Sequence, residues 1–118
     1  MASQKYQRDS RHLLAQARGE LTQGDLRQAS EKGWGAAALM MKAIAEQRGW
    51  EHERHRHLTR AASHLRALTG DGDVMDHFAR ANLLHENYYE DTFSQADVAE
   101  GLDRVGLLLD KLEPLLSP

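Results

Sequence analysis

The stretch DLRQASEKGWGAAALMMKAIAEQRG, residues 25–49, decides the fold class. Its apolar and small residues recur at spacings of three and four, which is the periodicity of one helix face. These residues are Leu26, Ala29, Gly33, Ala37, Met40 and Ile44. Asp25 can cap the start of the helix, while Arg48 and Gly49 supply a basic last turn and a glycine stop. The pattern predicts a long amphipathic helix whose small residues let a neighbouring helix approach closely.

Similar periodicity predicts one helix before this stretch and three helices after it. The preceding helix ends near Gly24. The next one carries apolar residues from position 58 to Leu68 and ends at Gly70. The turn at residues 71–73 then introduces a helix that runs to about Glu90.

The last helix is predicted from Ser94, which forms a weak capping box with Asp97, to Pro114. Alternating runs of Val, Ile and Thr, which would indicate strands, are nearly absent. Short connections between helices of this length favour antiparallel neighbours. We therefore expect an all-α fold, an antiparallel up-down bundle of four to five helices. A chain of 118 residues can bury one core, so a single domain over residues 1–118 is expected.

The composition points to a globular protein without membrane segments. Hydrophobic residues make up 41% and charged residues 28% of the chain. No apolar run approaches the roughly 20 residues that a membrane span needs, and the first residues lack the apolar stretch of a signal peptide. There is no cysteine, which excludes disulfides and thiolate chemistry. We expect a cytoplasmic protein that does not associate with membranes.

The net charge of −3 hides an uneven distribution. Residues 48–66 carry 5 arginines and 4 histidines against 2 glutamates, whereas residues 71–118 carry 3 basic and 11 acidic side chains. A polyanion such as RNA would therefore be bound locally, by the middle segment, in which Arg48 is a candidate substrate-binding residue. The alternative is that these charges form an ordinary solvated helix face.

His85 raises the main functional question. On a helical wheel with Val74 at 0°, it falls at about 20°, at the centre of an arc formed by Val74, Phe78, Ala81 and the two tyrosines at 88 and 89. An imidazole at that position must be hydrogen-bonded in the core, or must face a cleft or a partner subunit. Arg80 falls on the flank of the arc, about 140° from His85.

Together, Arg80 and His85 have the chemistry to cleave RNA without a metal or another cofactor. A histidine can transfer protons near neutral pH, and a guanidinium can hold a phosphate or stabilise a pentacovalent transition state. These two groups suffice to catalyse attack of an RNA 2′-hydroxyl on the adjacent phosphodiester. DNA cannot undergo this reaction, because it lacks the 2′-hydroxyl. As a pattern, Arg-x4-His is weak, because many helices contain it by chance.

Two longer stretches carry a family resemblance: residues 21–58, which include RGWEHERHRHL, and residues 83–91, LLHENYYED. They resemble the HEPN superfamily (higher eukaryotes and prokaryotes nucleotide-binding domain), and more closely its PaREP-type branch. The resemblance implies a helical bundle that forms a homodimer, with Arg80 and His85 of two subunits lining one cleft. It further implies a metal-independent endoribonuclease, commonly a toxin paired with a minimal nucleotidyltransferase.

One departure from the family pattern keeps a second function open. Active members usually have a polar residue directly after the arginine, where this chain has Ala81 followed by Asn82. The alternative is a non-catalytic dimeric helical module that binds nucleotide, RNA or a partner protein. In either case, we expect the small-residue face of residues 25–49 and the His85 face to be the candidate dimer interfaces.

Several further residues near these motifs are candidates for substrate binding: Asn82, Tyr88, which could orient His85 or stack on a base, and His55, expected to act as a cap or a cleft contact. The run HERHRH at residues 52–57 places His52 and His55 at i, i+3, a spacing that could hold Zn²⁺ or Ni²⁺. No recognised metal motif accompanies them, and we expect no metal site. Both tryptophans, at 34 and 50, are expected to pack rather than to stack on bases.

Overall fold

The computed structural model describes residues 2–117, and within that range it contains five α-helices and one short 3-10 helix. The α-helices are α1 (Ala2–Thr22), α2 (Leu26–Arg48), α3 (His55–Thr69), α4 (Gly72–Glu90) and α5 (Gln95–Leu112), and the 3-10 helix η1 (Glu113–Leu115) follows α5. No strand occurs among these residues. The predicted all-α bundle is confirmed.

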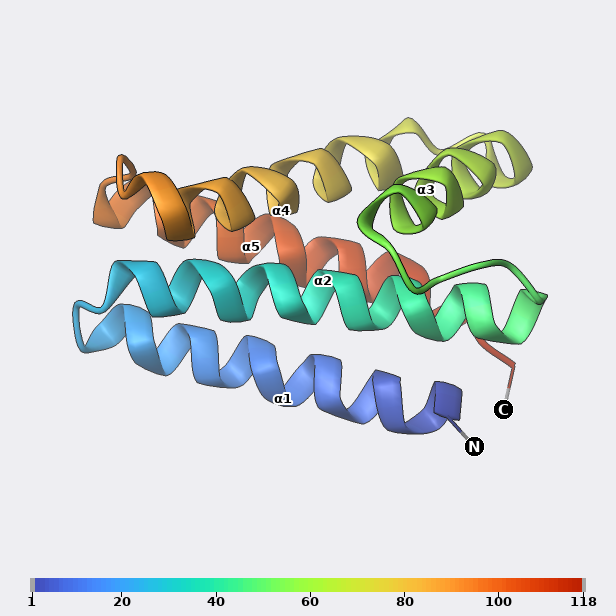
Figure 1. The fold of residues 1–118 in the computed structure, drawn as a ribbon, viewed down its shortest axis with the longest axis horizontal. Helices are drawn as coiled ribbons and strands as arrows, with labels where there is room; N and C mark the ends of the chain where they lie inside the picture. Colours follow the sequence, from blue (N-terminus) through green and yellow to red (C-terminus); the bar gives the residue numbers. More distant parts are fainter. Residues whose placement is uncertain (1, 118) are drawn as a thin grey trace.

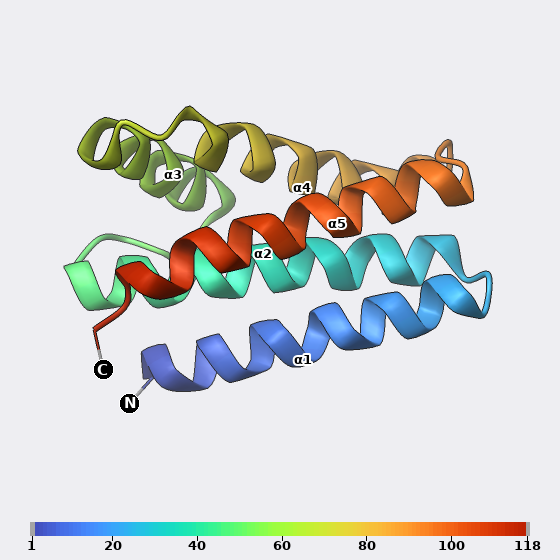
Figure 2. The same cartoon turned by 180° about the vertical axis from the view of Figure 1, so that it is seen from behind.

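Four of the helices run alternately up and down, and α3 is added at one end (Figure 1). α2 contacts α1, α4 and α5, whereas α3 packs mainly on α2 and α4. The connection at residues 50–54 turns back along α2, so α3 starts beside the middle of that helix rather than at its end. The view from behind shows α5 crossing over α2 between α1 and α4 (Figure 2).

The helix ends follow the local signals in the sequence. The Asp25 side chain accepts a hydrogen bond from the backbone N–H of Gln28 at 3.1 Å, and Gly49 ends α2 with a φ of 73°. Ser94 and Asp97 form the predicted capping box. At the start of α3 the cap is made by His57, whose Nδ1 accepts from the N–H of Arg54 at 3.1 Å. His55, expected as a cap or a cleft contact, is therefore not the residue that caps α3.

The small residues of α2 make its close packing possible, as predicted. A Cβ added at Gly33 would lie 2.5 Å from a methyl carbon of Leu102 and 3.1 Å from one of Leu84. Ala29 and Ala37 on the same helix are completely buried. This face of α2 is therefore covered by α4 and α5 of the same chain, and it is unavailable as the dimer interface that we expected there.

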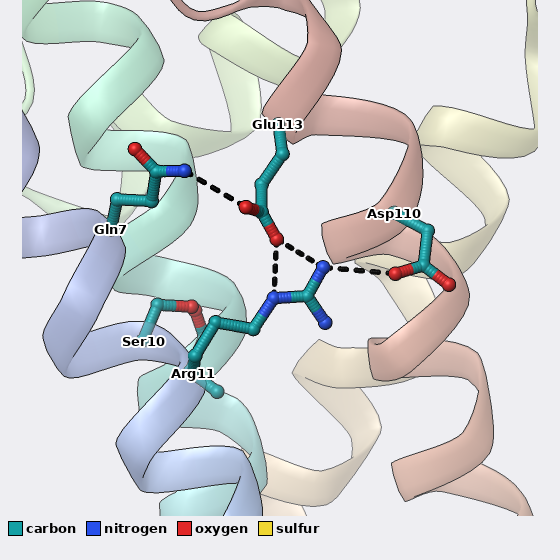
Figure 3. A network of polar contacts seen from close by, with 6 residues as sticks. Gln7, Ser10, Arg11, Asp110 and Glu113 are labelled. Carbon is teal, nitrogen blue, oxygen red and sulfur yellow. Dashed lines mark hydrogen bonds and ion pairs between the residues drawn. The ribbon is translucent and has the colours of Figure 1, made fainter.

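A polar network ties α1 to the C-terminal end of α5. Figure 3 shows Gln7 and Arg11 of α1 reaching Glu113, while Arg11 also bonds Asp110 at 2.9 Å. Beside them, the hydroxyl of Ser10 donates to the carbonyl of Ala36 in α2 at 2.6 Å. These contacts join the first helix of the chain to the last and close the bundle.

Within residues 2–117, four large hydrophobic side chains are exposed: Leu68, Leu83, Tyr89 and Leu107. Leu68 is 64% exposed, although its spacing predicted a buried residue. It lies in the last turn of α3, which packs mainly on α2 and α4, and most of its side chain faces solvent. Within residues 2–117 no helix combines the length and apolar character required to cross a membrane.

Candidate functional site

The buried face of α4 differs from the one that the helical wheel suggested. Its buried residues are Val74, His77, Phe78, Ala81, Leu84 and Asn87. The mean angle of these six residues on the wheel is about 320°, which is about 60° from the angle of His85. His85 is therefore at the margin of the buried face, with 30% of its side chain exposed. The shift arises because two polar residues, His77 and Asn87, are buried while Tyr89 is 66% exposed.

A carboxylate orients the imidazole of His85. Its Nδ1 lies 2.9 Å from Oε1 of Glu31 on α2. A carboxylate at this nitrogen favours the tautomer that carries its proton on Nδ1, which leaves a lone pair on Nε2. No hydrogen bond to Nε2 is formed within the part of the chain that the structure describes. His85 is thus held in place by one nitrogen and can accept a proton at the other.

Aromatic rings from three helices surround His85. Its ring centroid lies 5.2 Å from that of Trp34 on α2 and 5.5 Å from that of Tyr89, one turn further along α4. His55, the first residue of α3, stacks on Trp34 at 4.8 Å with the planes only 15° apart. The rings of His55 and His85 are 6.0 Å apart. We refer to Glu31, Trp34, His55, His85 and Tyr89 as the ring cluster.

Helix geometry explains why these five residues meet. Glu31 and Trp34 are three residues apart on α2, and His85 and Tyr89 are four apart on α4, so each pair shares one helix face. The two faces are opposed because α2 and α4 pack side by side. His55 joins them because the chain turns back at residues 50–54 before α3 begins.

Arg80 lies on the other flank of α4, against α5. Its guanidinium is 3.3 Å from a carboxylate oxygen of Glu100, and its Nε is buried without a hydrogen-bond partner among residues 2–117. Arg80 and Asn82 line a surface pocket of about 460 Å³ together with Arg104. A single chain therefore does not bring Arg80 and His85 into one site.

A second histidine is buried on this α5 flank. His77 lies next to Arg104, with its Nδ1 3.2 Å from the guanidinium. Burial, followed by the positive charge of Arg104, lowers the pKa of His77 below the ordinary value of 6.5. This flank thus holds a histidine of lowered pKa and two arginines, whereas the ring cluster holds two histidines and a carboxylate.

The other two candidate substrate-binding residues, Tyr88 and Arg48, contact residues other than His85, and the ring of Tyr88 packs edge-on against Tyr89 at 5.0 Å. The ring of Tyr88 lies under Arg27 at 5.1 Å, and its carbonyl accepts from that arginine's Nε at 2.8 Å. Glu31 and Tyr89 contact His85 in its place. Arg48 lies over the Trp50 ring at the end of α2, about 21 Å along the helix from Trp34 at a rise of 1.5 Å per residue.

The histidine run at residues 52–57 forms separate contacts. His52 bonds the carbonyl of Trp50 at 2.9 Å, and His57 lies 2.9 Å from a carboxylate oxygen of Glu51. Trp50 stacks on His64 at 5.0 Å. In the part of the chain that the structure describes, no three His, Asp or Glu side chains are grouped as metal ligands.

Two members of the ring cluster could not be found from the sequence. Glu31 reads as an ordinary charged residue in an amphipathic helix, and Trp34 reads as a packing residue. Trp34 is indeed buried at 9% exposure, but it packs against two imidazoles, with His55 stacked on it and His85 tilted against it, as well as against Phe78. The only available signal was the spacing of the two residues on one face of α2.

Comparison with known proteins identifies the family. The model of a family described as the archaeal PaREP1/PaREP8 family matches residues 5–109, which is most of the chain. The chain therefore belongs to this family. No curated protein matches it.

Proposed function

We propose that this member of the PaREP1/PaREP8 family is a metal-independent endoribonuclease of the HEPN type, with His85 as its acid/base residue. The observation that carries the proposal is the contact between Glu31 and Nδ1 of His85 at 2.9 Å. It holds the ring in one tautomer and leaves Nε2 to take the proton of an RNA 2′-hydroxyl. The partial exposure of His85 gives a substrate access to it.

The surroundings of His85 are suited to a nucleic acid. Tyr89 is largely exposed beside the imidazole and offers a face on which a base can stack. Arg54 and Arg56 flank His55 in the sequence and are both exposed, so their charges are available to phosphates. These features favour RNA over a small neutral ligand.

In this proposal Arg80 acts across a homodimer. It lies on the α5 flank of α4, so one chain cannot direct both Arg80 and His85 at one phosphate. A second subunit would supply the guanidinium that stabilises the transition-state charge. Mixing the His85→Ala and Arg80→Ala variants would then restore part of the cleavage, because some mixed dimers contain one intact site. A monomer in sedimentation at micromolar concentration would contradict the shared site.

The first test is cleavage of single-stranded RNA in EDTA. The wild type should produce 2′,3′-cyclic phosphate ends and should leave the 2′-deoxy substrate intact. His85→Ala should lower the rate by about 10²–10⁴-fold, while His12→Ala, an exposed histidine on α1, should have no effect. Cleavage that requires added metal, or that survives His85→Ala, would refute the proposal.

The proposed HEPN type also implies a role for the protein in the cell. A ribonuclease of this type would act as a toxin, neutralised by a minimal nucleotidyltransferase as its partner protein. Expression of the wild type should arrest growth, and expression of His85→Ala should not. Equal growth arrest by the wild type and by His85→Ala would show that toxicity does not depend on RNA cleavage by His85.

The second candidate function is a non-catalytic module that binds nucleotide, RNA or a partner protein. The observation that favours it is the ion pair of Arg80 with Glu100, which gives the arginine a structural partner. For such a module, the wild type would bind RNA in a fluorescence anisotropy titration without cutting it. Arg80→Ala would then lower the melting temperature rather than any rate.

A further inference from the structure

The ring cluster contains two histidines rather than one, and only one of them has a carboxylate partner. His85 is bonded to Glu31, whereas no hydrogen bond to the ring of His55 is formed within residues 2–117. Trp34 contacts both imidazoles: it stacks on His55 and packs against His85. The centroids of the two imidazole rings are 6.0 Å apart, and the ring planes differ by 35°.

Cleavage of RNA at a 2′-hydroxyl needs two proton transfers. A base takes the 2′-hydroxyl proton as the 2′-oxygen bonds to phosphorus. An acid gives a proton to the 5′-oxygen as the bond between phosphorus and that oxygen breaks. Each catalytic group must come within about 2.6–3.2 Å of its oxygen, so two imidazoles 6.0 Å apart can flank one phosphodiester.

We propose that His55 is the general acid of this reaction and His85 the general base, an assignment that rests on the proposed function. His85 accepts the proton of the 2′-hydroxyl at Nε2. Protonated His55 delivers its proton to the 5′-oxygen. The products are a 2′,3′-cyclic phosphate and a 5′-hydroxyl, and exchange with water resets both rings.

The environments of the two rings support this division of roles. The carboxylate of Glu31 stabilises the imidazolium that forms on His85 as it accepts a proton. His55 is exposed, its ring stacks on Trp34 without a hydrogen bond among residues 2–117, and Arg54 and Arg56 are its neighbours in the sequence. It can therefore exchange its proton with solvent and turn its nitrogen toward a leaving group.

The decisive variant is His55→Phe, because phenylalanine retains a flat ring that stacks on Trp34 but has no proton to give. On ordinary RNA, His55→Phe should cleave about 10²–10⁴-fold more slowly than the wild type. On RNA with a sulfur in place of the bridging 5′-oxygen, it should approach the wild-type rate, because a thiolate leaves without protonation. His85→Ala should remain slow on both substrates.

The matched control is His64→Phe. His64 is also exposed on α3 and stacks on a tryptophan, Trp50, at 5.0 Å, but it lies outside the ring cluster. The His64→Phe variant should cleave both substrates at the wild-type rate. The dependence of the cleavage rate on pH gives a second readout. The wild type should have a bell-shaped profile, and His55→Phe should lose the fall in rate at alkaline pH.

Three results would overturn the assignment. If His55→Phe cleaves ordinary RNA at the wild-type rate, His55 is not the general acid. Equal loss on the oxygen and sulfur substrates would show that His55 acts in binding instead. If the wild type cleaves no RNA at all, the proposed function fails and this inference fails with it.

Discussion

The two flanks of α4 each carry one residue of the Arg80/His85 pair, but the two flanks are built differently. On the flank toward α2 and α3, His85 is surrounded by rings, bonds one carboxylate and retains an unbonded nitrogen. On the flank toward α5, Arg80 pairs with Glu100 beside the buried His77. The first flank leaves one imidazole nitrogen of its motif residue without a partner among residues 2–117, whereas the second pairs its motif residue with a carboxylate.

The difference shows that motif spacing does not define a site. Five residues along an α-helix correspond to a rotation of about 140°, so Arg80 and His85 contact different neighbouring helices. Which of the two has functional surroundings depends on what those neighbours contribute. Here α2 contributes Glu31 and Trp34, whereas α5 contributes Glu100 and Arg104.

The largest expected effect comes from exchanging one carboxylate on each flank for an amide. Glu31→Gln can donate to Nδ1 of His85, which would move the ring proton to Nε2 and block its role as a base. RNA cleavage should fall by about 10²–10⁴-fold. The matched change Glu100→Gln removes the ion-pair partner of Arg80 but touches no proton-transfer group, so it should lower the rate far less than Glu31→Gln. An equal fall in the cleavage rate of both variants would show that the two flanks do not differ in their role.

The next effect separates a structural polar residue from His85. Asn87 is 1% exposed; its amide N–H donates to Ser30, and its oxygen accepts from the backbone N–H groups of Thr92 and Phe93. Asn87→Ala leaves these partners unsatisfied and should lower the free energy of unfolding by about 2–4 kcal/mol. His85→Ala should lower it by less than about 1 kcal/mol, because the site is partly exposed. Urea denaturation of both variants measures the two values.

A third prediction concerns the glycine that sets how closely α4 approaches α5. A Cβ at Gly101 would lie 2.6 Å from a methyl carbon of Leu84, which is itself completely buried. Gly101→Ala should therefore lower the free energy of unfolding by about 1–3 kcal/mol. Gly19 of α1 has no atom within 4 Å of such a Cβ, and Gly19→Ala should raise stability by about 0.5–1 kcal/mol. Stabilisation by both substitutions would show that Leu84 has room to move.

The smallest effect is the pH dependence from the α5 flank. The pKa of His77 is lower in the folded protein than in the unfolded chain, first through burial and then through Arg104. Its contribution to stability is therefore present above pH about 6.5 and is lost as the pH falls through the folded-state pKa. Unfolding free energies at pH 7.5 and 5.5 should differ less in His77→Gln than in the wild type. An unchanged difference would exclude His77 as the source.

Most of the fold was predictable because its signals are local. The caps at Asp25 and Ser94 and the stops at Gly49 and Gly70 act within one helical turn, and all four are in place. The apolar repeat of the last helix was also predictable, and its predicted core residues are all buried. These are Val98, Leu102, Val105, Leu109 and Leu112.

The candidate site was predictable only in part. His85 and His55 were identified as residues of interest, but their proximity to each other and to Trp34 was not. Periodicity also misplaced the buried face of α4, because it counts apolar residues and cannot recognise that His77 and Asn87 are buried with polar partners. The same limitation left the partner of His85, Glu31, unrecognised.

The sequence by itself determined where the helices begin and end, since capping, glycine stops and helical spacing depend on residues close together in the chain. It also determined the small-residue face of α2 around Gly33. The tertiary structure alone decided which side of α4 each motif residue faces, and that α3 starts beside Trp34. The reason is physical: a helix defines the angle between its own side chains, but the neighbours that those side chains meet depend on how the helices pack.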